Sequence, residues 1–394
     1  MNAIAALLVL AFADPAPTVD IATLSLKHSR GELISADAAG WKLRRDGQEE
    51  TVAIDDILTV EVLAAAKPAS SPALQVMLMD GSKLNAAQVG QESDAVTIES
   101  SSLGAQKLAR AAVSSIRFAA SPSLVDASWI ELLQRERRQD LLVVKKGDVL
   151  DFVEGVVSKI TANEVQVLLD KEPVTLKREK VFGVIYFQKA AATQKPSGLV
   201  ELVNGDRLFV RRVSASDGQF VLSLMSGAEA KIPLSDVQRL DLSLSKTWLS
   251  DLKPRDVKYE PSFLSLGANA TPLDAYRADY DVDTQNRRLQ VRDKEFHRGV
   301  SIRSKTLLRY RLNGDYARLR SWMGIQKGFY GDVHVELSLD GQKVLAADVL
   351  PEKEPQAIDL DVSGKFVLDV LVDYGANNYD VGDHLVLGHA RLTK

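Results

Sequence analysis

The sequence of 394 residues contains no cysteine. This absence excludes disulfides, thiolate nucleophiles, cysteine-ligated zinc and a lipid anchor attached through cysteine. The sequence also lacks a concentrated run of Lys and Arg, and its net charge is −4. Neutralising phosphates requires a basic face, so we exclude nucleic acid as a partner. Without disulfides, the folded chain must be stabilised by its core alone.

Long apolar runs are missing as well. A helix needs about 20 apolar residues to span a bilayer, and the run from Ala3 to Phe12 is shorter, so we predict no stable membrane span. The run ends in Ala11-Phe12-Ala13, a small-x-small pattern typical of signal-peptide cleavage. Residues 1–13 are therefore predicted to be a signal peptide of an exported protein, periplasmic or extracellular. The alternative is an irregular N-terminus of a cytosolic protein.

Motifs of catalysis are absent too. The sequence has no His-Glu-x-x-His, no Gly-x-Ser-x-Gly, no P-loop and no dinucleotide fingerprint. Glycoside hydrolysis needs two carboxylates across a cleft, and the small β units described next offer no large catalytic scaffold. We predict a protein that is not an enzyme. His384 and His389 are candidate metal ligands, but a core or solvated role is favoured.

One β pattern recurs four times before residue 244. Each copy has apolar strands separated by tight polar turns, such as Asn204-Gly205-Asp206, a strong hairpin signal. Each copy ends in apolar-x-x-apolar-x-apolar. Four or five short strands favour a small SH3-like or Sm-like barrel, with a continuous sheet or propeller blades as alternatives. The predicted copies are repeat 1 (19–63), repeat 2 (73–119), repeat 3 (140–189) and repeat 4 (198–244).

A single helix is expected to interrupt the repeats at residues 123–139. Val125, Trp129 and Leu132 define one apolar face, and a basic tail follows, which suits the helix dipole. We interpret the segment as a spacer helix packed on a neighbouring barrel. Linkers at 68–72 and 190–198 suggest that repeats 1 and 2 form one pair and repeats 3 and 4 another.

The pattern changes near residue 245. Strands become longer and alternate with period two, as in 307–312, 333–339 and 366–372. About eight such strands predict a two-sheet β-sandwich or jelly roll over 245–394. The whole chain is thus predicted to be all-β.

Several motifs in this last region carry a resemblance to a known family. Trp248-Leu-Ser-Asp251, Phe296-His-Arg-Gly299, Met323-Gly-Ile325 and Gly331-Asp-Val-His-Val335 occur in the order and spacing of NPCBM domains. The segment resembles this module, which is associated with glycoside hydrolase family 98. The resemblance implies a galactose-binding-like jelly roll with a role in glycan binding.

The candidate ligand site follows from this resemblance and from loop composition. Arg303 replaces a family histidine, and Gln326 and Lys327 replace an acidic pair, so the predicted ligand is an acidic glycan or none. Loops 326–332 and 374–383 combine tyrosines with amides and carboxylates. The predicted ligand-binding residues are Arg303, Gln326, Lys327, Tyr330, Asp332, Tyr374, Asn377 and Tyr379.

The second of these loops is rich in oxygen ligands. Asp373, Asp380 and Asp383 are the kind of residues that hold calcium, and a structural calcium is one interpretation. The other is a hairpin loop whose Asp and Asn side chains satisfy backbone groups. No other cofactor is expected.

Together these features predict an exported, non-enzymatic, multi-domain protein. A carbohydrate-binding module would sit on a β-repeat scaffold that offers surfaces to protein partners. One alternative is a structural or assembly protein of the envelope whose sandwich no longer binds sugar. Another is an accessory subunit of a polysaccharide-degrading system.

Overall fold

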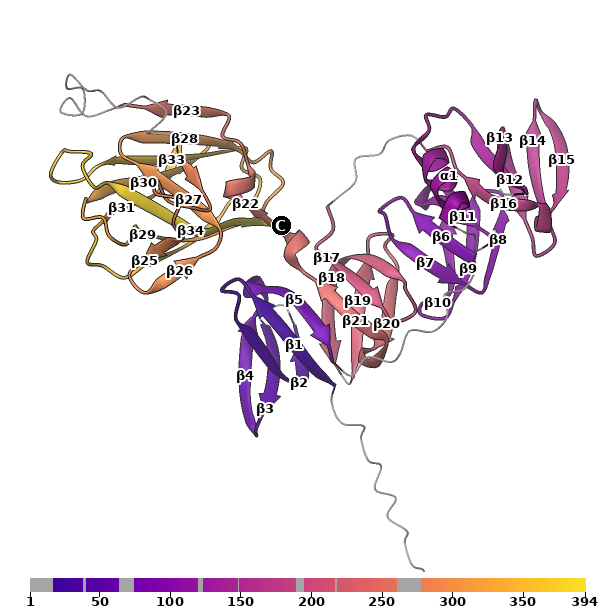
Figure 1. Ribbon diagram of the computed structural model, residues 1–394, viewed down its shortest axis with the longest axis horizontal. Helices are drawn as coiled ribbons and strands as arrows, with labels where there is room; N and C mark the ends of the chain where they lie inside the picture. The colour runs from indigo at the N-terminus through magenta and orange to yellow at the C-terminus, as the bar shows by residue number, and fades with distance from the viewer. Residues whose placement is uncertain are drawn as a thin grey trace, which may run out of the picture. The chain divides into compact units, whose positions relative to one another are not determined.

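The structure is a computed structural model, and it describes residues 17–37, 40–63, 74–119, 123–147, 149–188, 195–216, 218–260 and 278–394. The predicted signal peptide, the linker at 68–72 and part of the linker at 190–198 lie outside these residues. Two compact units divide the chain, with the boundary between Asp241 and Leu242. The described residues are almost all in strands and turns, which confirms the all-β prediction (Figure 1).

Each repeat in the first unit is built in the same way. Four strands form an antiparallel meander, a one-turn 3₁₀ helix follows, and the last strand pairs with the first. In repeat 2 the second strand is split in two, which gives that repeat six strands. Repeats 1 and 2 contain β1 (Thr18–Thr23), β2 (His28–Ala36), β3 (Gly40–Arg45), β4 (Gln48–Ala53), β5 (Ile57–Val62), β6 (Leu74–Leu78), β7 (Lys83–Ala86), β8 (Gln88–Glu92), β9 (Ala95–Ser100), β10 (Gly104–Ala109) and β11 (Val113–Arg117). Repeats 3 and 4 contain β12 (Asp140–Lys146), β13 (Val149–Ile160), β14 (Glu164–Leu169), β15 (Glu172–Lys177), β16 (Val181–Ile185), β17 (Gly198–Leu202), β18 (Arg207–Ser216), β19 (Gln219–Leu224), β20 (Glu229–Pro233) and β21 (Val237–Asp241).

The turns follow from local sequence. Asp46 and Gly47 both have positive φ, at 50° and 79°, as a two-residue type I′ hairpin turn requires. In repeat 4, Gly205 has a φ of 85°, and the amide of Leu202 donates to the carbonyl of Asp206 at 2.9 Å. These tight connections keep consecutive strands paired. The comparison of each repeat with an SH3-like barrel stays a prediction.

The pairing of repeats differs from the expected one. The last strand of repeat 4 pairs with the last strand of repeat 1, through Leu240 opposite Val60. The last strand of repeat 3 pairs with that of repeat 2, through Val184 opposite Ile116. The prediction of pairs 1–2 and 3–4 assumed that neighbours in sequence associate. It is wrong because the free edge of each last strand pairs with the free edge of another last strand, whatever number of residues separates the two in the sequence.

The helix α1 (Ser123–Gln134) packs on repeat 3. Val125 and Trp129 are buried against Phe182 and other apolar side chains of that repeat, which is the packing expected of the spacer. The helix ends at Gln134 rather than at residue 139. Past that end, the Arg137 guanidinium donates to the carbonyl of Leu133, so a side chain satisfies a carbonyl of the last turn.

The second unit is a sandwich of two antiparallel sheets, as predicted. One sheet has the order β24-β27-β34-β29-β32 with β22 beside β34, the other has β23-β28-β33-β30-β31, and β25 and β26 form a separate hairpin. The strands are β22 (Lys246–Trp248), β23 (Asp256–Tyr259), β24 (Asp279–Tyr280), β25 (Leu289–Val291), β26 (Lys294–Phe296), β27 (Gly299–Arg303), β28 (Thr306–Arg311), β29 (Arg318–Ile325), β30 (Val333–Leu339), β31 (Gln342–Val349), β32 (Gln356–Asp361), β33 (Val367–Tyr374) and β34 (His384–Thr393).

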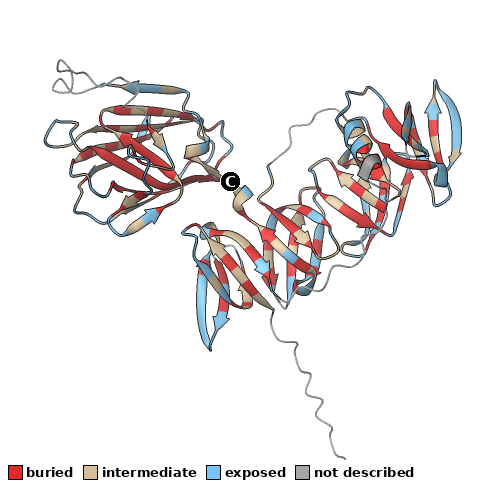
Figure 2. Ribbon diagram, in the orientation of Figure 1, coloured by how far each residue is buried: buried red, intermediate tan, exposed pale blue. Residues whose placement is uncertain are grey.

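The core of the sandwich lies between the two sheets. Alternate residues of each inner face are buried, as in Val333, Val335 and Leu337 of β30, which matches the period-two pattern of the sequence. The strand β34 is buried along its whole length, because sheet neighbours and core enclose it (Figure 2). His384 and His389 lie on this strand and are buried, so both are core residues.

Candidate functional site

Five strand ends and the loops between them form one end of the sandwich. Register pairs place Arg303 opposite His384, Ile325 opposite Leu385, and Val333 opposite Tyr374. The residues predicted for ligand binding therefore gather at one end, although they come from separate parts of the sequence. We refer to this end as the loop site.

The two predicted loops are joined directly. The amide of Gly331 donates to the carbonyl of Gly382 at 3.0 Å. The Asp332 carboxylate accepts hydrogen bonds from the amide of Ala376, at 2.6 Å, and from the side-chain amide of Asn377. The two loops therefore converge, and the bonds between Asp332 and residues 376 and 377 hold them together.

Two tyrosines project from the joined loops. Tyr330 is 76% exposed and Tyr379 is 48% exposed. The ring of Tyr330 lies beside Gly382: a Cβ at that glycine would be in van der Waals contact with its Cδ2 atom, at 3.5 Å. Gly382 has a φ of 81°, a conformation that glycine adopts without strain. Exposed aromatic faces beside amides and carboxylates suit contact with a sugar ring.

Gln326 is placed differently from the prediction. Its side chain is buried, its oxygen accepts from the amide of Gln290 at 3.0 Å, and its amide donates to Asp283 and to the carbonyl of Arg288 at 3.2 Å each. With its hydrogen-bonding groups used internally, Gln326 supports the loop site and does not face a ligand. Lys327, by contrast, is exposed, and its Nζ lies 3.8 Å from the carboxylate of Asp293.

Arg303 belongs to an unexpected cluster at the base of the site. The ring of Phe329 stacks on His384 with centroids 3.7 Å apart, and the Arg287 guanidinium lies 5.7 Å above the Phe329 ring. Burial, together with the positive charge of Arg303, lowers the pKa of His384 to about 4. His384 is therefore neutral at physiological pH, and Phe329 and Arg287 form part of the surface.

Asp283 anchors this cluster from below. It is buried, and its carboxylate accepts from the amide, the Nε and the Nη2 of Arg287, each at 2.8 Å. Sequence reasoning missed Asp283, Arg287 and Phe329. The only sequence signal for these residues is their position in the loops that precede β25 and β30. Such loops are too common to identify a site.

Asp383 is the most perturbed carboxyl group of the site. It is fully buried, its Oδ2 accepts from the Ser304 hydroxyl, and its Oδ1 has no hydrogen-bond partner among the described residues. Burial, aided by the negative charges of Asp332 and Asp380, raises the pKa of Asp383 to about 7. A carboxyl group in this state is a poor ligand for calcium at neutral pH.

The remaining predicted residues have structural partners. The Tyr374 hydroxyl donates to the carbonyl of Glu260 at 2.6 Å, and burial raises its pKa to about 12. Asp373 accepts from the amide of Tyr374 and lies 3.7 Å from Lys305. Among the described residues, no three His, Asp or Glu side chains are arranged to hold a metal ion. Calcium binding by Asp373, Asp380 and Asp383 stays a prediction, and the described residues contain no ligand cluster that supports it.

The two sheets and the loops at one end define a β-sandwich module. Residues 245–393 match the family model of the NPCBM/NEW2 domain, so the C-terminal unit is an NPCBM domain, as the sequence motifs indicated. No curated protein matches the chain.

Solved structures similar to the chain include three with family 51 carbohydrate-binding modules. The module from a Clostridium perfringens family 95 glycoside hydrolase, in complex with methyl-galactose, is 17% identical with a TM-score of 0.32, over 38% of this chain and 99% of that one. A C. perfringens ZmpB structure with GlcNAc is 14% identical with a TM-score of 0.33, over 48% of this chain and 42% of that one. Tandem modules of a Streptococcus pneumoniae family 98 glycoside hydrolase are 12% identical with a TM-score of 0.32, over 66% and 90%.

Within the described ranges, none of the helices has both the length and the apolar character that crossing a bilayer requires.

Proposed function

We propose that this protein is an exported, non-enzymatic glycan-binding protein that recognises its ligand with the loop site of the NPCBM domain. The observation that carries the proposal is the exposed Tyr330 ring beside the joined loops of an NPCBM domain. A flat aromatic can cover the apolar face of a sugar, and the nearby amide and carboxylate groups can bond its hydroxyls. The repeats would serve as the scaffold and as a surface for protein partners.

The charges of the site suggest the class of glycan. Arg303 and the exposed Lys327 donate hydrogen bonds and accept none, and charge-assisted bonds to a carboxylate or sulfate are stronger than neutral ones. The ligand we propose is therefore an acidic polymer that contains uronic acid or sulfate. Asp293, 3.8 Å from Lys327, would turn away from that lysine when the ligand binds.

Calorimetry tests both parts of this proposal. Polygalacturonate, methyl-galactose and GlcNAc would be titrated into the full chain at low and high salt. We expect polygalacturonate to bind with an affinity that falls as salt rises. Tight, salt-insensitive binding of a neutral sugar would contradict the acidic ligand while keeping glycan binding.

A matched pair of substitutions locates the site. Tyr330→Ala should weaken binding about tenfold, because stacking and burial of the aromatic ring are lost. Phe366 is also highly exposed, at 60%, but it precedes β33 and lies at the other end of that strand from the loop site. Phe366→Ala should leave affinity unchanged. Equal effects of both substitutions would place the ligand elsewhere.

A structural role in the cell envelope is the second candidate. The strand pairings between repeats connect all strands of the first unit into one hydrogen-bonded system, which suits a rigid spacer or assembly element. Failure of every polymer to bind would favour this candidate. Binding that requires a polysaccharide-degrading enzyme as partner would instead favour the accessory subunit.

A further inference from the structure

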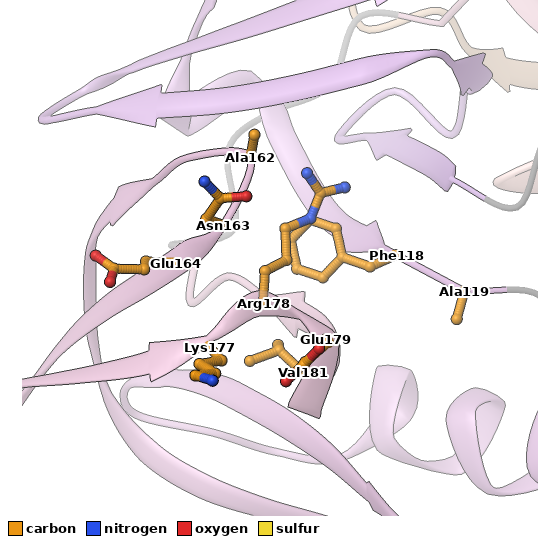
Figure 3. A pocket seen from close by; sticks show the side chains of 9 residues that line it. All are labelled: Phe118, Ala119, Ala162, Asn163, Glu164, Lys177, Arg178, Glu179 and Val181. Atoms are coloured by element: carbon orange, nitrogen blue, oxygen red, sulfur yellow. The ribbon is translucent and has the colours of Figure 1, made fainter.

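A pocket of about 560 Å³ opens at the junction of repeats 2 and 3 (Figure 3). Phe118 and Ala119 line it from repeat 2, and Asn163, Arg178 and Val181 line it from repeat 3. A second hollow of about 410 Å³ shares Arg178 with it. Small-molecule sites in proteins typically have volumes of about 300–1,000 Å³, so the space suits a small ligand.

Arg178 occupies the centre of this pocket. Its guanidinium carbon lies 4.5 Å from the centroid of the Phe118 ring. Among the described residues, the guanidinium forms no hydrogen bond and no ion pair, and Glu164 points away from it (Figure 3). Burial lowers the pKa of Arg178. A partly buried cation without an anion is an unfavourable arrangement.

The neighbouring repeat contains a counterpart of this arginine. Arg178 and Arg110 each begin the 3₁₀ turn before the last strand. The amide of Arg178 donates to the carbonyl of Asn163 at 2.8 Å, and that of Arg110 donates to the carbonyl of Asp94 at 2.7 Å. Arg110 lies 5.5 Å from the ring of Tyr186, the residue after the last strand of repeat 3. The two junctions are thus built alike.

Their counter-ions differ. Arg110 Nη1 is 3.2 Å from the buried carboxylate of Asp140, the first residue of β12. Strand registers give the equivalent of Asp140 in repeat 2: Leu142 faces Val184 as Val76 faces Ile116, so Asp140 corresponds to Leu74. The position in repeat 2 that corresponds to Asp140 is therefore a buried leucine, which carries no charge.

A second carboxylate is replaced in the same way. Asp94 Oδ1 lies 3.9 Å from Arg110 Nε. Its counterpart beside Arg178 is Asn163, a neutral amide that lines the pocket. The junction with both carboxylates has a paired arginine. The junction without them has a pocket beside Arg178, which forms no ion pair with a described residue, although Glu164 and Glu179 also line the pocket.

We propose that this pocket binds the carboxylate of a small organic acid, which serves as the counter-ion of Arg178 in the way that Asp140 serves Arg110. The apolar part of the acid lies against Phe118, Ala119 and Val181. The carboxylate accepts hydrogen bonds from the guanidinium and from the Asn163 amide. This site is separate from the proposed glycan-binding function, since it belongs to the repeats.

The test uses the full chain and two matched probes, 4-phenylbutyrate and its neutral amide, 4-phenylbutyramide. Ligand-observed NMR and calorimetry measure the binding of each probe. We expect saturable binding of the acid, and binding of the amide at least about tenfold weaker, because charged hydrogen bonds are lost. Equal affinity for the two probes, or no saturable binding of the acid, would overturn the proposal.

Variants tie the binding to Arg178. Arg178→Gln should weaken binding of 4-phenylbutyrate about tenfold or more. Arg45→Gln, a change of the same kind at an exposed arginine of repeat 1, should have no effect. Retained affinity in Arg178→Gln, with an unchanged melting temperature, would refute the site.

A further variant decides the matter if Arg178→Gln does not fold. Asn163→Asp restores the carboxylate that Asp94 supplies in repeat 2 and so competes with the ligand for Arg178. We expect this variant to weaken binding of the acid a few-fold, because the new carboxylate forms an exposed ion pair with Arg178. Binding of the amide should be unchanged. An unaltered affinity for the acid in this variant would also overturn the proposal.

Discussion

Replacing Asp383 by asparagine should make the NPCBM domain more stable at alkaline pH. Asp383 is fully buried, and its pKa of about 7 is raised well above the ordinary value of 3.8. The folded domain therefore keeps this proton to higher pH than the unfolded chain does. The unfolded state loses the proton first, so the free energy of unfolding falls as pH rises from about 4 to about 7.

The size of this effect follows from the shift. A change from 3.8 to about 7 at about 1.36 kcal/mol per unit gives about 4 kcal/mol. Water entry and relaxation around a buried charge reduce such penalties, so we expect a loss of about 2–4 kcal/mol. Asparagine is neutral at every pH and can still accept the hydrogen bond from Ser304. The Asp383→Asn domain should thus escape the loss.

Urea unfolding of residues 245–394 at pH 4 and pH 8 measures this difference. The variant should unfold with a free energy about 2–4 kcal/mol higher than the parent at pH 8, and near it at pH 4. Asp361→Asn is the control, because hydrogen bonds from Ser363 lower the pKa of this exposed carboxyl group, so its removal brings no gain at pH 8. If Asp383→Asn lowers stability equally at both pH values, the carboxyl group is not protonated in the folded domain and the reasoning fails.

Three further predictions concern the rest of the chain. Residues 245–394 should fold alone with one cooperative melt, since the unit has its own core; a fragment without a melt would show that the boundary is wrong. The native protein should begin at Asp14 outside the cytoplasm, and N-terminal sequencing that returns an intact first methionine would contradict export. Gly183→Ala should destabilise the repeats by about 1–3 kcal/mol, because a Cβ there would lie 2.6 Å from the Ile116 carbonyl oxygen and 2.7 Å from the Trp129 ring; an unchanged melting temperature would argue against this close approach.

The sequence predicted the sandwich and the two loops at its end, but it did not predict which side chains of those loops are buried. Period-two alternation reports directly on which residues face a core, so strands such as 333–339 were predictable. The exposed Tyr330 was also predictable, because its loop is short and polar. The burial of Gln326 was not, since its partner Asp283 lies 43 residues away and no local pattern links the two.

The repeats illustrate a similar limit. Hairpin turns and closing strands are local, and each was visible in the sequence. Which closing strand meets which depends on edges that are open only after each repeat has folded. Leu240 beside Val60 could not be read from spacing, because the two strands are alike in pattern to those of the other repeats.

The pairing of the last strands is nested: repeats 2 and 3 pair with each other, and repeats 1 and 4, which flank them in the sequence, pair with each other. The inner pair can form as soon as repeat 3 leaves the ribosome, but the edge of β5 must wait until β21 has been made. An unpaired edge strand is a template for wrong partners, so synthesis of this protein has a vulnerable interval that ends only with repeat 4.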